Sequence, residues 1–203
     1  MRRGRSVKQR GVTIVELAIV MLVLSMLLGL GAPSLATWLA NQRLRTSAES
    51  ILHGLNTARG EAVRRNARVV FEMTDPGGQG SWRVCPVAPG TLACYEGEAP
   101  VLVRDGGEES GNVRIGASTD AALLLPGAFA TALSPGAGMP GVVMFDGLGR
   151  TANPAGWLNT VRFDARDTHI DAADERRLVV AVSPGGAARL CDPRTPSGNP
   201  AAC

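Results

Sequence analysis

The sequence predicts an α+β protein in which a long N-terminal α-helix packs against an antiparallel β-sheet. Three observations predict it: an uncharged apolar segment near the N-terminus, an amphipathic segment directly after it, and a series of short apolar runs separated by turn residues. Glycine and proline, with 25 and 13 of 203 residues, favour many turns over a helical bundle. We therefore expect a long helix followed by one β-rich globular domain.

The basic residues are concentrated at the N-terminus. Five of them precede Gly11, and no acidic residue lies among them. The rest of the chain holds 16 basic and 18 acidic side chains, so the overall charge of +3 is no argument for nucleic-acid binding. A basic segment next to an apolar run is typical of a targeting signal.

The apolar segment has the length of a membrane span. Residues 17–40 carry no formal charge, and a helix of that length extends about 36 Å, against about 30 Å of hydrocarbon. The basic residues before it predict a cytoplasmic N-terminus, with everything after about Arg43 exported. The alternative is a signal peptide cleaved at the small residues 34–36, but the apolar run exceeds the usual length of roughly 7 to 15 residues.

One acidic residue, Glu16, lies at the start of this segment. A carboxylate at the centre of a bilayer costs about 2.5 to 3.5 kcal/mol and needs a partner, which its own neighbourhood in the sequence does not supply. Glu16 therefore indicates more than a plain membrane anchor. The alternative is a structural role near the lipid headgroups.

Residues 9–17, Gln-Arg-Gly-Val-Thr-Ile-Val-Glu-Leu, resemble the processing motif of type IV prepilins and type II secretion pseudopilins. In that motif a basic leader ends in glycine, and glutamate is the fifth mature residue. The resemblance implies that a prepilin peptidase cleaves after Gly11 and methylates the amine of Val12, where the family most often has phenylalanine. It also implies that Glu16 pairs with the N-terminal amine of a neighbouring subunit and sets the register of a filament.

Pro33 lies within the apolar run. A proline inside a helix removes one hydrogen bond and clashes with the preceding turn, so we predict a kink there. Pilins carry a proline at the matching position. The alternative is a proline that the bilayer tolerates without a special role.

After the apolar run, apolar residues repeat at three- and four-residue steps, which predicts that the helix continues with one buried face. These residues are Leu44, Ala48, Ile51, Leu52, Leu55, Ala58, Ala62 and Val63. Residues 41–66 resemble the GspH/FimT branch of minor pilins and pseudopilins. The resemblance divides the chain into a cleaved leader, a transmembrane half-helix, an amphipathic half-helix and a periplasmic β-rich domain. These parts are residues 1–11, 12–40, 41–67 and 68–203.

Beyond residue 68, short apolar runs predict strands, and glycine-rich or proline-rich clusters predict turns. The predicted strands are residues 69–73, 82–85, 101–103, 113–115, 142–145, 160–163 and 178–182. The predicted turns are residues 75–78, 105–107, 146–149 and 184–186. We expect residues 117–141 to form a long loop with a short strand at 123–125, or else a surface that meets another subunit.

The four cysteines, Cys85, Cys94, Cys191 and Cys203, lie in the exported part. An oxidising compartment favours disulfides over metal ligation, and neither spacing matches a zinc knuckle. Of three possible pairings, the two local ones are favoured, Cys85 with Cys94 and Cys191 with Cys203. Pilins commonly close their C-terminal region in this way.

No catalytic, cofactor or metal motif stands out, so we expect a protein that is not an enzyme. His53 and His169 are expected to be solvated. Residues 136–141 match G-x-G-x-x-G, but they contain a proline and open no helix, so we attribute the match to chance. The carboxylates within residues 164–175 lack the spacing of an EF-hand and are expected to form a solvated loop.

The resemblance implies a structural minor pilin or pseudopilin of a type IV pilus or a type II secretion pseudopilus. Its partners would be prepilin peptidase, other pilins and the inner-membrane assembly platform. It would cross the bacterial inner membrane once, with its C-terminal domain in the periplasm, before entering a filament.

A DNA-binding minor pilin of a DNA-uptake pilus is the alternative function. Some FimT-like pilins carry a C-terminal G-R-x-R motif that contacts DNA. Residues 186–189 are Gly-Ala-Ala-Arg, so the first arginine is missing, and Arg189 and Arg194 remain as candidate contacts. Because each phosphate contact adds to affinity, we expect any binding of nucleic acid to be weak.

Overall fold

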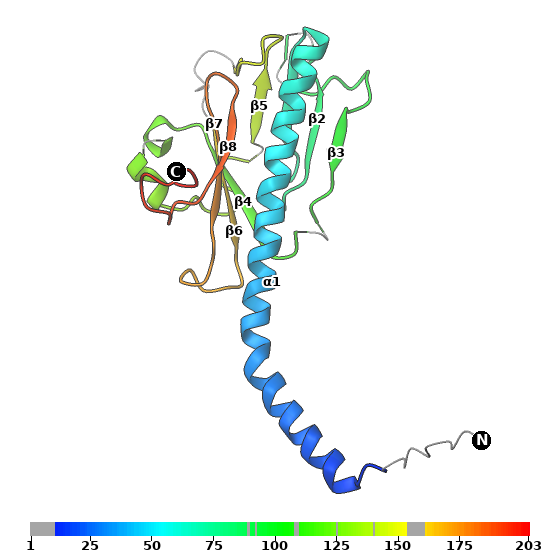
Figure 1. Cartoon of the computed structure of the whole chain (residues 1–203). Helices are drawn as coiled ribbons and strands as arrows, with labels where there is room; N and C mark the ends of the chain where they lie inside the picture. The colour runs from blue at the N-terminus through cyan, green and yellow to red at the C-terminus, as the bar shows by residue number, and fades with distance from the viewer. Residues whose placement is uncertain are drawn as a thin grey trace, which may run out of the picture. The chain divides into compact units, whose positions relative to one another are not determined.

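The computed structural model describes residues 11–88, 90–91, 93–107, 110–124, 126–139, 141–153 and 161–203. The chain divides into two compact units, Met1–Trp38 and Leu39–Cys203. Helix α1, Ile14–Arg65, contributes to both units (Figure 1). Apart from Gly11, the expected leader lies outside the described residues.

Local hydrogen bonds set both ends of α1. At the start, the backbone N–H of Glu16 donates to Oγ1 of Thr13 at 3.2 Å, so Thr13 caps the helix. At the end, Asn66 adopts a left-handed conformation with φ of 48°, and the N–H of Ala67 donates to the carbonyl of Ala62. This pattern closes the helix and satisfies a terminal carbonyl. The helix is thus two residues shorter at each end than the predicted range 12–67.

The first half of α1 presents its apolar side chains to the outside. The large apolar residues from Val12 to Leu28 are all exposed. Among the described residues, no single helix qualifies by length and apolarity as a membrane span, whereas Ile14–Gly29 and Ser34–Arg65 qualify together across a bend. The side chains of residues 30–33 lie outside the description, so a kink caused by Pro33 stays a prediction.

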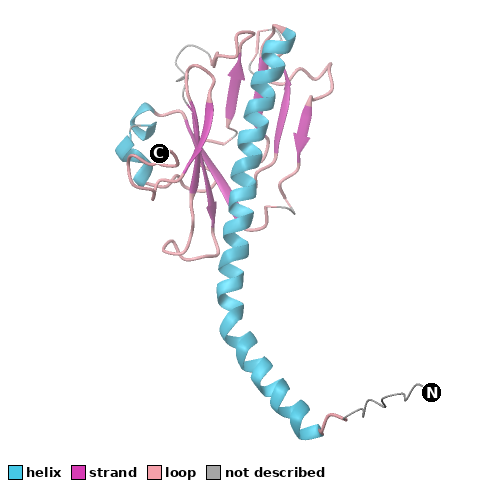
Figure 2. Cartoon of the chain, in the orientation of Figure 1, coloured by secondary structure: helices cyan, strands magenta, loops and turns pink. Residues whose placement is uncertain are grey.

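The described part of Leu39–Cys203 contains two antiparallel four-stranded sheets (Figure 2). The first has the order β3-β2-β1-β5, with β1 Val69–Met73, β2 Trp82–Pro86, β3 Leu102–Arg104 and β5 Val142–Phe145. The second has the order β4-β6-β7-β8, with β4 Val113–Ser118, β6 Val161–Asp167, β7 Leu178–Val182 and β8 Ala188–Cys191. The predicted class, a long helix packed on antiparallel sheet, is confirmed. We expected one sheet, and the structure has two.

The predicted strand at residues 123–125 is wrong. Two 3₁₀-helices, η1 (Ala121–Leu124) and η2 (Pro126–Ala130), occupy this region, and residue 125 lies outside the description. The side chain of Asp120 accepts a hydrogen bond from the N–H of Ala122 and so favours a helical turn. Pro126 starts η2, a position where the backbone N–H would have no partner within the helix, so its absence costs no hydrogen bond.

Strand β8 was not predicted, because its sequence Ala-Arg-Leu-Cys has no β-branched or aromatic residue. It forms because the turn at residues 184–186 returns the chain against β7, with Ala188 opposite Val182. Residue 160, which was expected to begin the strand that is β6, lies outside the described residues.

The amphipathic half of α1 supplies one face of a core that both sheets share. The helix residues in this core are Leu44, Ala48, Ile51, Leu55, Ala58 and Ala62. Gly54 lets α1 approach the first sheet closely, because a Cβ at this position would lie 2.6 Å from the ring of Phe71. Phe71 in turn meets Phe163 of the second sheet edge to face, with ring centroids 5.9 Å apart. The helix and both sheets therefore form one hydrophobic core.

Polar contacts at one end of the core tie the two sheets and the helix together. Arg59 of α1 donates from Nε to the carbonyl of Gly149 at 2.9 Å, in the turn that follows β5. The backbone N–H and the hydroxyl of Thr151 both donate to the carbonyl of Pro184, in the turn between β7 and β8. Gly186 has φ of 78°, and a Cβ there would lie 1.9 Å from the carbonyl oxygen of Gly149. Only glycine fits this contact without displacing the backbone.

We expect Gly186→Ala to lower the free energy of unfolding by about 2 kcal/mol or more, because it adds strain and a clash with backbone. Gly185→Ala is the matched control, since the nearest atom to a Cβ there is 3.9 Å away. Urea unfolding of the two variants measures the difference. Equal stability of both variants would contradict this account of the contact between the sheets.

Candidate functional site

The residues expected to direct processing and assembly lie at the start of α1. Gly11 and Val12 precede the helix, and Glu16 is the acidic residue of its first turn. All three are exposed. Val12 lies two residues before the helix and four residues before Glu16 in the sequence. Cleavage after Gly11 would therefore create an amine four residues away from the carboxylate.

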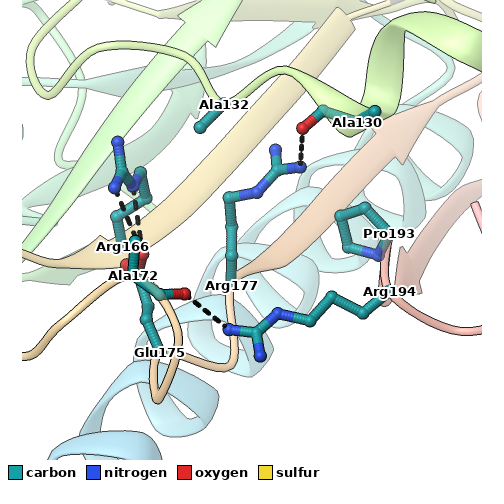
Figure 3. A pocket seen from close by; sticks show the side chains of 8 residues that line it. All are labelled: Ala130, Ala132, Arg166, Ala172, Glu175, Arg177, Pro193 and Arg194. Atoms are coloured by element: carbon teal, nitrogen blue, oxygen red, sulfur yellow. Dashed lines mark hydrogen bonds and ion pairs between the residues drawn. The ribbon is translucent and has the colours of Figure 1, made fainter.

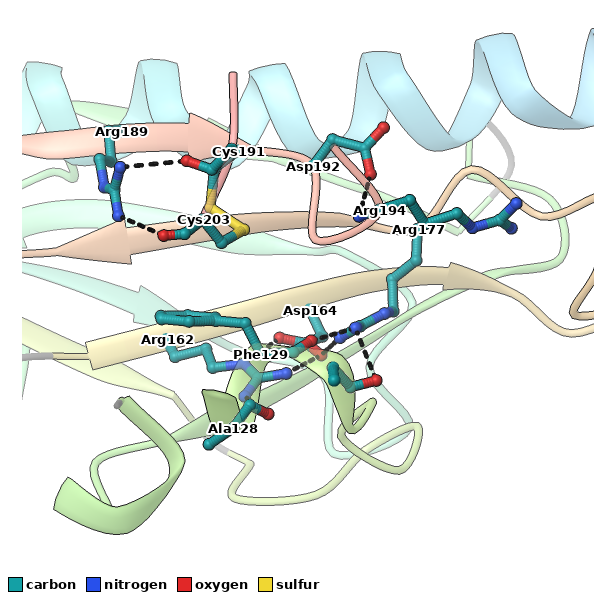
Figure 4. The surroundings of a disulfide bond; sticks show 12 residues. Ala128, Phe129, Arg162, Asp164, Arg177, Arg189, Cys191, Asp192, Arg194 and Cys203 are labelled. Carbon is teal, nitrogen blue, oxygen red and sulfur yellow. Dashed lines mark hydrogen bonds and ion pairs between the residues drawn. A yellow bond between two sulfur atoms is a disulfide. The ribbon is translucent and has the colours of Figure 1, made fainter. Parts of the chain in front are cut away.

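Two disulfides close local loops in the globular domain. Cys85 is joined to Cys94 and Cys191 to Cys203, with Cα–Cα distances of 5.4 and 5.0 Å. These are the two local pairings favoured from the sequence. The second bond holds the C-terminal segment against β8 (Figure 4).

A buried network of charges lies beneath η1 and η2. Arg162 and Asp164, two residues apart on β6, have fully buried side chains and pair through Nε to Oδ1 at 2.6 Å and Nη2 to Oδ2 at 2.7 Å. Arg177 also donates to Oδ2 of Asp164 (Figure 4). The network therefore holds two cations for one anion.

Backbone carbonyls of the segment 123–131 compensate the excess positive charge. Arg162 donates to the carbonyls of Leu123, Ala128 and Thr131 at 2.9, 3.1 and 2.6 Å. Its guanidinium also lies over the ring of Phe129, 4.9 Å from the centroid. Arg177 donates to the carbonyls of Phe129 and Ala130. These contacts anchor the long loop onto the second sheet, and cations next to aromatic faces are themselves stabilised.

The solvated acidic loop expected at residues 164–175 is therefore only partly correct. Asp171 and Asp174 are exposed, but Asp164, Asp167 and Glu175 are buried. Strand alternation explains Asp164, because residues 162 and 164 share one face of β6 and that face is covered. The signal in the sequence was the Arg-x-Asp pair, but the predicted strand 160–163 ended one residue before Asp164, whereas β6 continues to Asp167. His53 and His169 are exposed, in agreement with the prediction.

The two arginines considered for DNA contact do not share partners. Arg189 donates to the carbonyls of Ala202 and Cys203, both at 3.3 Å. Arg194 donates to the carbonyls of Ala173 at 2.9 Å and Ala172 at 3.0 Å. Both side chains are exposed, but each guanidinium is already engaged by backbone oxygens.

Arg194 forms one wall of a hollow of about 380 Å³, which we name the arginine pocket (Figure 3). Its walls come from the end of η2 and the loop after it, from β6 and the connection to β7, and from the C-terminal segment. The lining residues are Ala130, Ala132, Arg166, Ala172, Glu175, Arg177, Pro193 and Arg194. Arg166 pairs with Glu175 at 3.2 Å, and Glu175 also accepts from the backbone N–H of Asp167 at 2.7 Å.

Hydrogen bonds near the surface lower the pKa of two carboxyl groups outside the pocket. Hydrogen bonds from Arg64 and then Arg65 lower the pKa of Glu61 to about 2. The backbone N–H of Arg150 is the main cause of a lowered pKa of Asp146 in the turn after β5.

Within the described residues, no group of three or more His, Cys, Asp or Glu side chains could hold a metal ion.

Comparison with known proteins identifies a family. The sequence model of the family described as "Type II transport protein GspH" matches residues 47–186. Two crystal structures of the type IV minor pilin FimU of Pseudomonas aeruginosa are similar in fold, each with 18% sequence identity. The first has a TM-score of 0.49 and covers 78% of this chain and 92% of FimU. The second has a TM-score of 0.46, with 76% and 94% covered. No curated protein sequence matches this chain.

We expect Arg162→Met to lower the free energy of unfolding by about 3 to 5 kcal/mol. The reason is that the buried carboxylate of Asp164 loses one of its partners, and three backbone carbonyls lose this donor where water cannot replace it. Arg162→Lys keeps the charge without the paired donors and should lie between wild type and Met. Arg45→Met is the control, since its exposed pair with Glu49 contributes at most about 1 kcal/mol. Denaturant unfolding followed by circular dichroism measures all three. A loss no larger than that of the control would show that the network is dispensable.

Proposed function

This chain belongs to the GspH family of type II transport proteins, and we propose that it is a minor pilin or pseudopilin, a non-enzymatic subunit that assembles with other pilins into a filament. The family match over residues 47–186 is the observation that carries this proposal. The fold supports it, because an amphipathic half-helix packed on antiparallel sheets follows an exposed apolar half-helix. The processing motif at residues 9–17 lies outside the family match and supports it independently.

The proposal assigns the start of α1 to processing and assembly. Prepilin peptidase cleaves after Gly11 and methylates the new amine of Val12. The apolar half-helix first anchors the subunit in the inner membrane, with the globular domain in the periplasm. The assembly platform then transfers it into a filament, where the carboxylate of Glu16 meets the N-terminal amine of a neighbouring subunit. Pairing removes the cost of a lone charge in apolar surroundings.

Mass spectrometry of the protein from cells tests the processing step. The expected mature form begins with N-methylated Val12. In cells without prepilin peptidase, we expect the protein to stay uncleaved and to begin at Met1. A cellular protein that retains its first eleven residues would overturn the proposal.

We expect Glu16→Ala to leave membrane insertion and cleavage unchanged but to reduce incorporation into filaments by about tenfold or more, because the neighbour's amine loses its partner. Immunoblots of the membrane and sheared-filament fractions measure both quantities. Glu49→Ala is the matched control, since Glu49 is an exposed acid on the same helix that pairs with Arg45. Normal incorporation of Glu16→Ala would remove the assembly role of this residue.

The family match does not choose between a secretion pseudopilus and a type IV pilus. Deletion of the gene, scored for secreted enzymes and for surface pili in parallel, separates the two machines. Loss of secretion alone identifies a pseudopilin, and loss of pili or of twitching alone identifies a minor pilin.

DNA binding by Arg189 and Arg194 stays a prediction from the resemblance to FimT-like pilins. A gel shift with the full chain in detergent, at low and at physiological salt, tests it. If DNA binds through these cations, the shift weakens in the double variant Arg189→Gln/Arg194→Gln and at higher salt. No shift at low salt would retire this alternative.

A further inference from the structure

We propose that the arginine pocket binds a carboxylate group from outside the chain. Three guanidinium groups line the hollow, those of Arg166, Arg177 and Arg194, and Glu175 is the one carboxylate among its lining residues. Guanidinium groups recognise carboxylates through paired, charge-assisted hydrogen bonds.

The guanidinium groups of the pocket are held in place before any ligand arrives. Arg177 is anchored by Asp164 and by the carbonyls of Phe129 and Ala130 in η2. Arg166 is anchored by Glu175, and Arg194 by the carbonyls of Ala172 and Ala173. Binding therefore needs little further ordering of these long side chains, which is otherwise a cost of association.

Two of the anchored groups keep donors for a ligand. The bonds between Arg166 and Glu175 use Nε and Nη2, and those of Arg194 use Nη1 and Nη2. Within the described part of the chain, no hydrogen bond uses Nη1 of Arg166 or Nε of Arg194. Both side chains line the hollow (Figure 3). These two N–H groups belong to residues that line the same hollow, so they are the donors that a ligand there would use.

The charges around the pocket favour a monoanion over a phosphate or a polyanion. Glu175 lies in the wall, Asp164 lies behind Arg177, and the exposed Asp171 and Asp174 flank Ala172 and Ala173 on the same connection. These carboxylates offset most of the positive charge of the three guanidinium groups, so a second negative charge on the ligand gains little net attraction. A carboxylate carries one charge and fits the planar donors, so it is the ligand that this balance of charges supports.

The source of the carboxylate rests on the proposed function. In a filament, the group that reaches the pocket is an acidic side chain of a neighbouring subunit. The C-terminal segment that forms one wall is tied to β8 by the disulfide between Cys191 and Cys203, so the pocket has a fixed rim for such a contact.

The pocket itself is tested with the full chain, purified in detergent and labelled with ¹⁵N in its arginine side chains. N-acetylglutamic acid amide, which carries only the side-chain carboxylate, should give saturable shifts of the Arg166 and Arg194 signals. N-acetylglutamine amide, its neutral match, should give none. We expect Arg194→Gln to weaken binding by about tenfold, and the exposed Arg45→Gln to leave it unchanged. Equal shifts with both probes, unaltered binding by Arg194→Gln, or tighter binding of inorganic phosphate would overturn the proposal.

The source is tested in cells, where incorporation of Arg194→Gln into sheared filaments is compared with that of Arg45→Gln. Reduced incorporation with normal cleavage after Gly11 supports a neighbouring subunit as the donor of the carboxylate. Normal incorporation of a variant that has lost probe binding overturns that source. If the chain is not processed or assembled at all, the proposed function fails, while the titration still decides the pocket.

Discussion

Both sheets depend on the burial of a single helix face, from Leu44 to Ala62. Each sheet has four short strands, and the clusters that it buries outside the shared core are small, so neither sheet forms a core of this size alone. The amphipathic half of α1 contacts both sheets, and the Phe71–Phe163 contact joins them directly, so their apolar faces share one core. Arg59 and Gly186 matter because they hold the turns of the two sheets against the end of this helix. The globular domain therefore includes its half of the helix as an integral element.

The loop that contains η1 and η2 is held by buried arginines as well as by the apolar packing of Phe129. Long segments without regular strands are uncommon in compact domains unless something orders them. Here carbonyls within residues 123–131 accept from two buried guanidinium groups that share the single carboxylate of Asp164. The same arrangement positions Arg177 at the inner end of the arginine pocket. A stabilising network and a candidate binding site thus share one side chain.

The helix, the strands and most turns could be predicted because their signals are local. The three- and four-residue spacing of Leu44, Ala48 and Ile51 is visible in the sequence, and so is the Asp-Gly turn at residues 146–149. Strand β8 and the 3₁₀-helices could not be predicted, because β8 depends on pairing with β7 and the loop depends on distant arginines. The burial of Asp164 was missed for the same reason: a sequence shows which residues alternate along a strand but not which loop covers the second face.

Charge acts in three different surroundings in this chain, and the surroundings decide what it contributes. On the outer face of α1, Arg45 and Glu49 pair in water, where such a pair adds little. Inside the domain, Arg162 and Asp164 are removed from water, so each charged group needs hydrogen-bond partners. Arg162 finds some of them in backbone carbonyls within residues 123–131, and these bonds fix the position of that loop. Glu16 lies in an apolar segment that, under the proposed function, leaves water on entering a membrane or a filament. The physical demand on Glu16 is then the same as on Asp164, with one difference: its partner has to come from another molecule. A requirement that stabilises a fold within one chain becomes, between chains, a requirement for assembly.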